Sequence, residues 1–178
     1  MDASTTETSY SGAITAVPYA FRASDSRLCK LYVLVGGLLT LGGTILFGLG
    51  TLALLSSIAG APAGVFTFQP ALYLLVWLFV IAPIIAPILL VARQHRLHDG
   101  TVEYDRWIAL SGFLVLLALY GGALIAAPAG QRGSVPSGVF GPIVQFLYGL
   151  PPESGLIPPL VAVLVMGAVH RLQGHPSN

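Results

Sequence analysis

The hydrophobic pattern of the chain is dominated by one long run, residues 31–92, which contains no Lys, Arg, Asp, Glu or His. A helix of about 20 apolar residues crosses the roughly 30 Å hydrocarbon layer of a bilayer, so this run is long enough to cross twice. Residues 60–64, with the sequence Gly-Ala-Pro-Ala-Gly, supply a turn in its middle. The pattern therefore predicts a helical hairpin, with transmembrane helices over residues 28–57 and 70–92.

Two later apolar segments, residues 108–127 and 155–172, predict a third and a fourth transmembrane helix. The apolar stretch at residues 137–149 between them is too short to span a bilayer, so we expect an interfacial or a re-entrant helix there. The fold class that follows is all-α: a polytopic membrane protein with four transmembrane helices in a bundle and one short extra helix.

This pattern divides the chain into a polar N-terminal segment (1–27), a transmembrane domain (28–172) and a C-terminal tail (173–178). We expect the N-terminal tip, which carries Asp2 and Glu7, to be disordered. Residues 18–28 contain aromatic and basic side chains and could lie along the membrane surface. Ser24 or Asp25 is the expected N-cap of the first transmembrane helix.

Small residues recur at helical spacing in the first and third predicted spans. Spacings of four residues place such side chains on one stripe, where two helix backbones approach closely. We predict that the two stripes pack against each other, and a path for a substrate along them is the alternative. The helix-packing residues are Gly36, Thr40, Thr44 and Gly48 in the first span, and Ala118, Gly122 and Ala126 in the third.

Two prolines, Pro83 and Pro87, lie one turn apart in the second predicted span. Each proline removes a backbone donor and displaces the carbonyl four residues earlier, so we expect a kink or local unwinding near Ala82. Transporters use such breaks as binding sites, whereas prolines are also common in membrane helices that only pack. Both interpretations stay open on the sequence.

Composition agrees with a membrane protein and excludes a nucleic-acid partner. Hydrophobic residues make up 55% of the chain and charged residues 8%, against about 25% charged residues in a soluble domain. The net charge is +1, and no dense basic run interleaved with aromatic residues occurs. The expected partners are the lipid bilayer and either further copies of the chain or a larger membrane complex.

The distribution of basic residues predicts the orientation. With four spans, one side of the membrane holds seven basic residues and the other holds only Arg132. The side richer in Lys and Arg faces the cytoplasm. We therefore predict a multi-pass protein of the cell membrane with both termini in the cytoplasm. The seven residues are Arg22, Arg27, Lys30, Arg93, Arg96, Arg106 and Arg171.

The loop between the second and third spans holds the only candidates for a metal site. His95 and His98 are three residues apart, and with Asp99 or Glu103 they could bind a metal ion. A solvated connector explains them as well, because the loop carries both signs of charge and no third histidine at a suitable spacing. We predict no metal, no cofactor and no catalytic residues.

Other polar residues supply no catalytic constellation either. His170 lies at the end of the fourth span, and no serine has a base beside it in the pattern. The single cysteine, Cys29, excludes an intrachain disulfide. It is either a small apolar residue at a helix start or, being juxtamembrane, a palmitoylation site.

Three functional hypotheses remain. The first is an accessory or assembly subunit, or a structural membrane protein. The second is a small transporter or channel for an uncharged or lipid-like solute that uses the Pro83/Pro87 break. The third is an enzyme or cofactor protein that uses His95, His98 and His170, although the sequence favours a protein that is not an enzyme.

Three stretches, residues 18–29, 89–95 and 150–159, resemble small four-helix integral membrane proteins of haloarchaea with no assigned function. The resemblance implies an archaeal plasma membrane. It implies no activity and no site residues.

Overall fold

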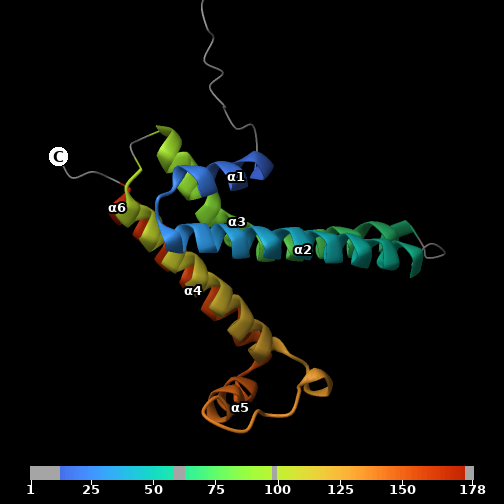
Figure 1. The fold of residues 1–178 in the computed structure, drawn as a ribbon. Helices are drawn as coiled ribbons and strands as arrows, with labels where there is room; N and C mark the ends of the chain where they lie inside the picture. Colours follow the sequence, from blue (N-terminus) through green and yellow to red (C-terminus); the bar gives the residue numbers. More distant parts are fainter. Residues whose placement is uncertain (1–12, 58–62, 98–99, 175–178) are drawn as a thin grey trace, which may run out of the picture.

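The computed structural model describes residues 13–57, 63–97 and 100–174, and this part of the chain is helical without strands (Figure 1). Four helices are long and apolar enough to cross a membrane. The predicted all-α fold class, with four membrane-spanning helices and a short extra helix, is confirmed. The elements in order are α1 Ala13–Ala23, α2 Arg27–Ser57, α3 Ala63–Leu97, α4 Val102–Ala126, η1 Ala129–Gln131, α5 Gly141–Gly149, η2 Pro152–Leu156 and α6 Ile157–Gln173.

The limits of three spans differ from the prediction. α3 begins at Ala63 and ends at Leu97, where the sequence suggested residues 70–92. α4 begins at Val102, six residues before the predicted start, because the Thr101 side chain caps it. The fourth span consists of the 3₁₀ helix η2 followed by α6. Residues 60–62 of the predicted turn lie outside the described residues.

α1 packs against α2 and α3, and its position along a membrane surface stays a prediction. Ala16 and Ala20 are fully buried against α2 and α3. A methyl group added at Gly37 of α2 would lie 3.4 Å from Val17 of α1, which is ordinary van der Waals contact. Small side chains on both helices therefore allow this close approach. The tip with Asp2 and Glu7 lies outside the described residues.

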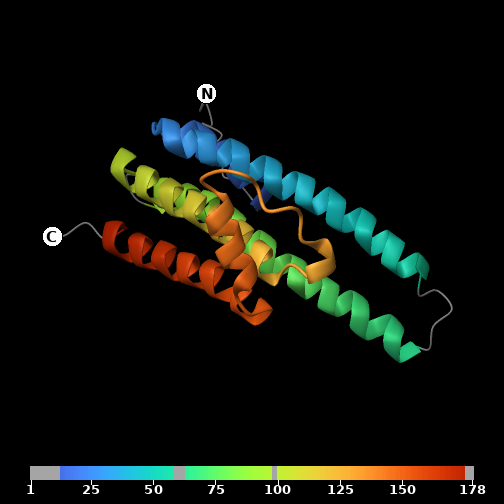
Figure 2. The same ribbon diagram turned by 90° about the horizontal axis from the view of Figure 1, so that it is seen from below.

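One end of the molecule collects most of the charge. α1, the first turns of α2 and α4, and the last turns of α3 and α6 lie there together (Figure 2). We call it the basic end, because it carries Arg22, Arg27, Lys30, Arg93, Arg96, Arg106 and Arg171. The other ends of the helices lie in two separate places, which we together call the far end: η1 and α5 lie beyond the end of α4, and the ends of α2 and α3 near residues 57 and 63 lie apart from them (Figure 1).

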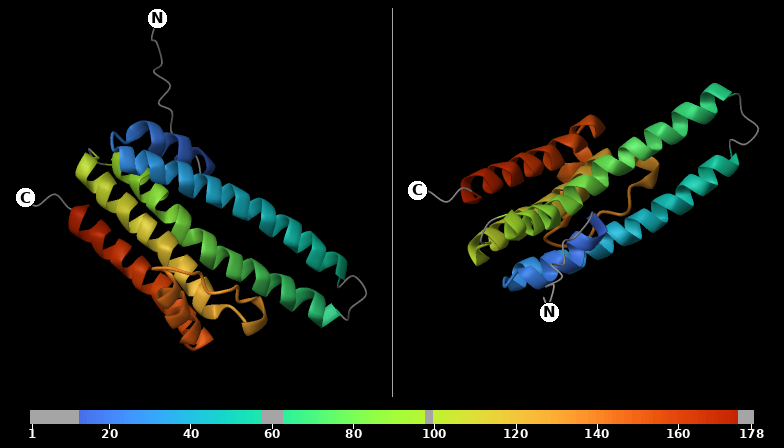
Figure 3. Two further views of the ribbon diagram at one scale, coloured as in Figure 1. Left: turned by 60° about the horizontal axis from the view of Figure 1, so that its bottom comes forward. Right: turned by 90° about the horizontal axis from the view of Figure 1, so that it is seen from above.

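Two pairs of helices run from the basic end and diverge (Figures 1 and 3). α2 and α3 form one arm, and α4 and α6 form the other. At the basic end α4 contacts α2, α3 and α6, whereas α5 contacts α4 and neither α2 nor α3 within the described residues. The main buried cluster, which includes Tyr32, Ile88, Tyr104 and Ile108, lies at the basic end. The far half of the α2–α3 arm is therefore packed only on itself.

Candidate functional site

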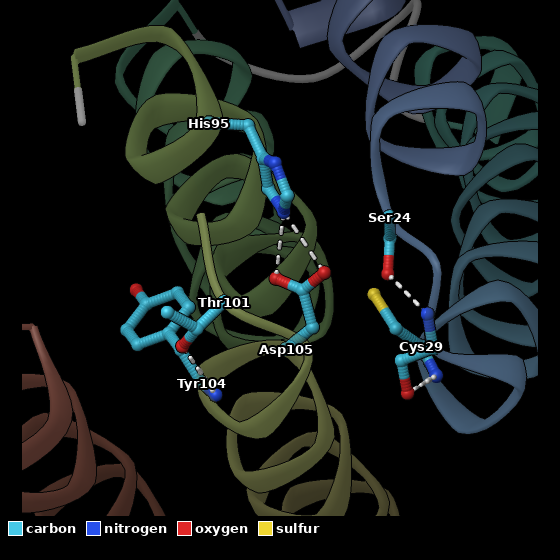
Figure 4. Close-up of polar contacts among 7 residues, drawn as sticks. Ser24, Cys29, His95, Thr101, Tyr104 and Asp105 are labelled. Atoms are coloured by element: carbon cyan, nitrogen blue, oxygen red, sulfur yellow. Dashed lines mark hydrogen bonds and ion pairs between the residues drawn. The ribbon is translucent and has the colours of Figure 1, made fainter. Parts of the chain in front are cut away.

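The basic end contains a buried pair of ionisable side chains (Figure 4). The His95 Nε2 atom lies 2.9 Å from Oδ2 and 3.0 Å from Oδ1 of Asp105. The Asp105 side chain is 1% exposed and that of His95 is 14% exposed. A carboxylate removed from water needs a donor and a compensating charge, and His95 supplies the donor. Asp105 also lies in the first turn of α4, where the helix dipole favours a negative charge.

The short link between α3 and α4 places this pair. The Thr101 side-chain oxygen accepts a hydrogen bond from the Tyr104 backbone N–H at 3.2 Å, which starts α4. Gly100 lies directly against the His95 ring, and any side chain at that position would collide with the ring. Because α3 continues to Leu97, His95 faces the first turn of α4 across the link. The length of α3, the Thr101 cap and Gly100 together determine how His95 and Asp105 face each other.

A second polar contact joins α4 to α6. The Tyr104 hydroxyl lies 2.8 Å from His170 Nδ1, and the two rings meet edge to face at 6.0 Å. Tyr104 is 1% exposed. The basic ends of α3, α4 and α6 are thus joined through the neighbouring residues Tyr104 and Asp105.

The link between α1 and α2 faces the same cluster. Ser26 accepts a hydrogen bond from the Cys29 backbone N–H at 3.4 Å, so Ser26 caps α2, and the predicted caps Ser24 and Asp25 do not. Ser24 instead accepts from the Ser26 N–H at 3.2 Å. Cys29 is 1% exposed, and its sulfur points into the molecule towards Asp105 (Figure 4). The structure thus favours Cys29 as a small core residue over Cys29 as a lipidation site.

Of the four residues considered for a metal site, only His95 and Glu103 lie within the described part of the chain. His95 contacts Asp105, a residue the sequence argument did not select, and His98 and Asp99 lie outside the described residues. Within the described ranges, no group of three His, Cys, Asp or Glu side chains has a metal-binding arrangement. The cluster can stabilise the buried carboxylate of Asp105 and fix the ends of α3, α4 and α6 relative to one another. It shows no nucleophile in contact with the His95 ring among the described residues.

Tyr32 of α2 lies where α2, α3 and α4 meet, and it covers the Pro83/Pro87 region of α3. Its hydroxyl donates to the Ile84 carbonyl at 2.7 Å, and its ring meets Phe113 of α4 edge to face at 5.2 Å. Proline at position 87 lacks the N–H that would bond the carbonyl four residues back, and it weakens the turn around it. The carbonyl freed by Pro87 is that of Pro83, so the Tyr32 bond to the neighbouring Ile84 carbonyl does not replace the lost bond and instead joins α2 to the proline region of α3.

α3 stays α-helical through Pro70, Pro83 and Pro87, so the local unwinding expected near Ala82 does not occur. Pro87 is buried, and its ring lies close to Gly112 and Tyr32. Two hollows of the described residues, one between α2 and α3 and one between α4 and α6, are lined by neither Pro83 nor Pro87. The geometry therefore favours a packing role for these prolines over a binding site.

The small-residue stripes pack differently from the prediction. Gly36 faces Tyr32 and Ile88, but Thr44 and Gly48 are exposed and do not meet α4. Thr44 donates to the Thr40 carbonyl at 2.6 Å, which satisfies its hydroxyl locally. On α4, Gly122 lies against Gly155 of η2, which also contacts Ala126, while Ala118 is half-buried. The α4 stripe thus serves the α4–α6 arm and does not join the stripe of α2.

Sequence reasoning missed Tyr32, Tyr104 and Asp105. Tyr32 lies in the first predicted span without a motif around it, and its side chain is 1% exposed. Asp105 was taken as part of a solvated loop. A signal did exist: Thr101 precedes an apolar helix with acidic residues in its first turn, which is an N-terminal pattern that would have moved the start of α4 to Val102.

Comparison with known proteins adds a family and nothing on activity. No curated protein and no solved structure matches the chain. A family described as a domain of unknown function, DUF8056, matches residues 1–174. That match covers nearly all of the chain, including every helix described above. The protein therefore belongs to the DUF8056 family, and its four apolar helices indicate a membrane protein.

Proposed function

We propose that the protein is an accessory or assembly subunit of a membrane complex, with a partner that covers the far half of the α2–α3 arm. The observation that supports this is the one-sided packing of the arm. Leu46 of α2 and Phe79 of α3 are both 70% exposed, and no other described helix reaches this half. The proposal assigns this surface to a second protein.

The length of the arm supports the same conclusion. At 1.5 Å per residue, the 31 residues of α2 span about 46 Å, well beyond a hydrocarbon layer of roughly 30 Å. Its far half is held by one seam, in which Phe47 stacks on Tyr73 at 4.6 Å and on Trp77 at 4.9 Å. Helices in lipid associate through close packing and hydrogen bonds, because lipid gives no hydrophobic driving force. A partner helix would add a second seam.

The alternative is a small transporter or channel for an uncharged or lipid-like solute at the Pro83/Pro87 region. The geometry gives it little support, since Tyr32 fills that region and hydrogen-bonds its backbone. A catalytic role at the basic end has less support still, because Asp105 is the only hydrogen-bond partner of the His95 ring among the described residues. The subunit hypothesis requires neither a cavity nor a reactive group.

We further propose that the basic end faces the cytoplasm and that the membrane is the cell membrane. Seven basic residues lie at the basic end, and Arg132 lies at the far end. Arg132 donates from Nε to the Ala127 carbonyl and lies over the Tyr148 ring, as expected for a lone cation at an interface. An archaeal membrane stays a prediction from the resemblance.

The test is site-specific photocrosslinking in native membranes. A photoreactive residue replaces Leu46 or Phe79 on the proposed partner surface, and Leu164 serves as the control because it is 72% exposed on α6 of the other arm. The proposal predicts a discrete crosslinked protein from the first two positions and only lipid adducts from the third. Lipid adducts alone from all three positions would contradict it.

A homo-oligomer is distinguished by coexpressing two differently tagged copies. A crosslink that carries both tags identifies a second copy of the chain as the partner. A crosslink with one tag and an added mass identifies another protein, which mass spectrometry then names.

A further inference from the structure

We propose that the groove between α4 and α6 binds one hydrocarbon chain of an anionic phospholipid, with the lipid phosphate held by Arg106. The groove has a volume of about 440 Å³ and lies in the half of the α4–α6 arm next to the basic end. This volume falls in the range of roughly 300–1,000 Å³ that is typical of ligand sites. Its main lining residues are Trp107, Leu110, Leu114 and Leu117 of α4, and Val165 and Val169 of α6.

The side chains that line the groove are suited to the hydrocarbon chain of a lipid, which has no polar groups. All six of the main lining side chains are hydrocarbon or aromatic. The one hydroxyl in the groove belongs to Ser111, and it already donates to the Ile108 carbonyl at 2.8 Å. The remaining polar group of the lining is the Trp107 indole N–H, so the groove offers a polar solute one donor and no free acceptor side chain. A lipid chain fits this chemistry, whereas a sugar or an amino acid does not.

The mouth of the groove carries a positive charge. Arg106 lies four residues before Leu110, one of the lining residues, so these two residues share a face of α4. Side chains on a helix point towards its N-terminus, which directs Arg106 from the groove to the basic end. Arg106 is exposed and has no ion pair or hydrogen bond among the described residues.

The charge balance of the basic end favours an anionic headgroup. The described acidic residues there are Asp25, Glu103 and Asp105, and Asp105 is buried and held by His95. Seven basic residues outnumber them. Each Lys or Arg near a membrane surface attracts anionic lipid measurably, and an Arg guanidinium can bind a phosphate with two hydrogen bonds. Trp107, which is 44% exposed, lies at the depth where aromatic side chains meet headgroups.

The test uses Trp107 as the reporter in purified protein. The chain has two tryptophans, so Trp77→Phe leaves Trp107 alone, and a phenylalanine at position 77 keeps the stacking on Phe47. The protein is reconstituted into vesicles that contain chain-brominated phosphatidylglycerol or chain-brominated phosphatidylcholine. The proposal predicts stronger quenching of Trp107 by the anionic lipid than by the zwitterionic one. No partner protein is needed, so this result does not depend on the proposed subunit function.

Arg106→Gln tests the headgroup contact. We expect the preference for the anionic lipid to fall about five-fold, the effect of one arginine near the membrane surface. Arg171→Gln is the matched control, because it removes the same charge at the same end from the α6 face opposite Val169. Equal preference in the two variants, or no preference in the unmodified reporter, would overturn the proposal and identify ordinary boundary lipid.

Val165→Phe tests the chain position by filling the groove from α6. Quenching by both brominated lipids should fall in this variant and stay unchanged in Leu164→Phe, which places the same ring on the outward face of α6. Helix content and elution volume in detergent confirm that each variant is folded. A reporter that neither lipid quenches would show that no lipid chain enters the groove, which would also contradict the proposal.

Discussion

The two ends of the α2–α3 arm are made of the same helices but are stabilised differently. At the basic end, Tyr32 is buried among α2, α3 and α4 and donates to the Ile84 carbonyl. In the far half, Phe47, Tyr73 and Trp77 form a single seam, and the Trp77 indole N–H has no hydrogen-bond partner among the described residues. The tertiary packing of the arm is therefore concentrated at one end.

This difference shows which interactions organise a membrane bundle. Apolar side chains have about the same free energy in lipid as in a protein core, so the exposure of leucines in the far half costs little stability. Hydrogen bonds between buried groups and close backbone approach at glycine are what lipid cannot replace. The buried hydrogen bonds of Tyr32 and His95 lie at the basic end, whereas the close backbone approach of Gly122 and Gly155 lies towards the other end of α4. Three substitutions test this contrast, each with a control.

The largest effect is expected at the contact of His95 with the buried Asp105. His95→Ala leaves the fully buried Asp105 carboxylate without its donor, and breaking a buried pair in this way costs about 3–5 kcal/mol. The measurement is the free energy of unfolding in mixed micelles, from a titration with SDS. Glu103→Ala, in the same turn of α4 but exposed, should change it by less than about 0.5 kcal/mol.

A double variant tests the pairing itself. His95→Ala combined with Asp105→Ala removes the uncompensated charge and should be more stable than His95→Ala alone. If His95→Ala costs no more than Glu103→Ala, the pair does not hold the basic end together.

An intermediate effect is expected at a glycine. A methyl group at Gly112 would lie 2.6 Å from the Tyr32 ring, which packing cannot accommodate without displacing α2 from α4. Gly112→Ala should cost about 1–3 kcal/mol in the same titration, as overpacked cores do. Gly48→Ala in the far half meets nothing within 4 Å and should be neutral or slightly stabilising, because alanine is the better helix former. Equal effects of the two variants would remove the contrast between the ends.

The smallest effect is expected from a single hydroxyl. Tyr32→Phe keeps the ring at the three-helix junction and deletes the donor to the Ile84 carbonyl, at a cost of about 0.5–1.5 kcal/mol. Tyr73→Phe removes a hydroxyl from the far half, where it lies against Gly50, and should change stability less. A larger loss from Tyr73→Phe would place the critical hydrogen bond in the far half instead.

The helices themselves could be predicted from the sequence, because runs without charge and the lengths needed to span a bilayer are local properties. The short helix α5 was predicted for the same reason. The site could not be predicted, since the Asp105–His95 pair depends on α3 continuing to Leu97 and α4 beginning at Val102. The role of Tyr32 depends on contacts among three helices that are far apart in the sequence. Hydrophobic period and composition are local properties and do not predict such contacts.

The divergence of the two arms is the claim on which the account depends, and distances between paired spin labels in a bilayer test it most directly. Labels at Leu31 and Leu110 report α2 and α4 at the basic end, and labels at Leu52 and Tyr120 report the same helices towards the far end; all four side chains are exposed. The buried Cys29 is replaced by alanine to provide the background. The account predicts a clearly longer distance for the far pair, whereas equal distances would show parallel helices and contradict it.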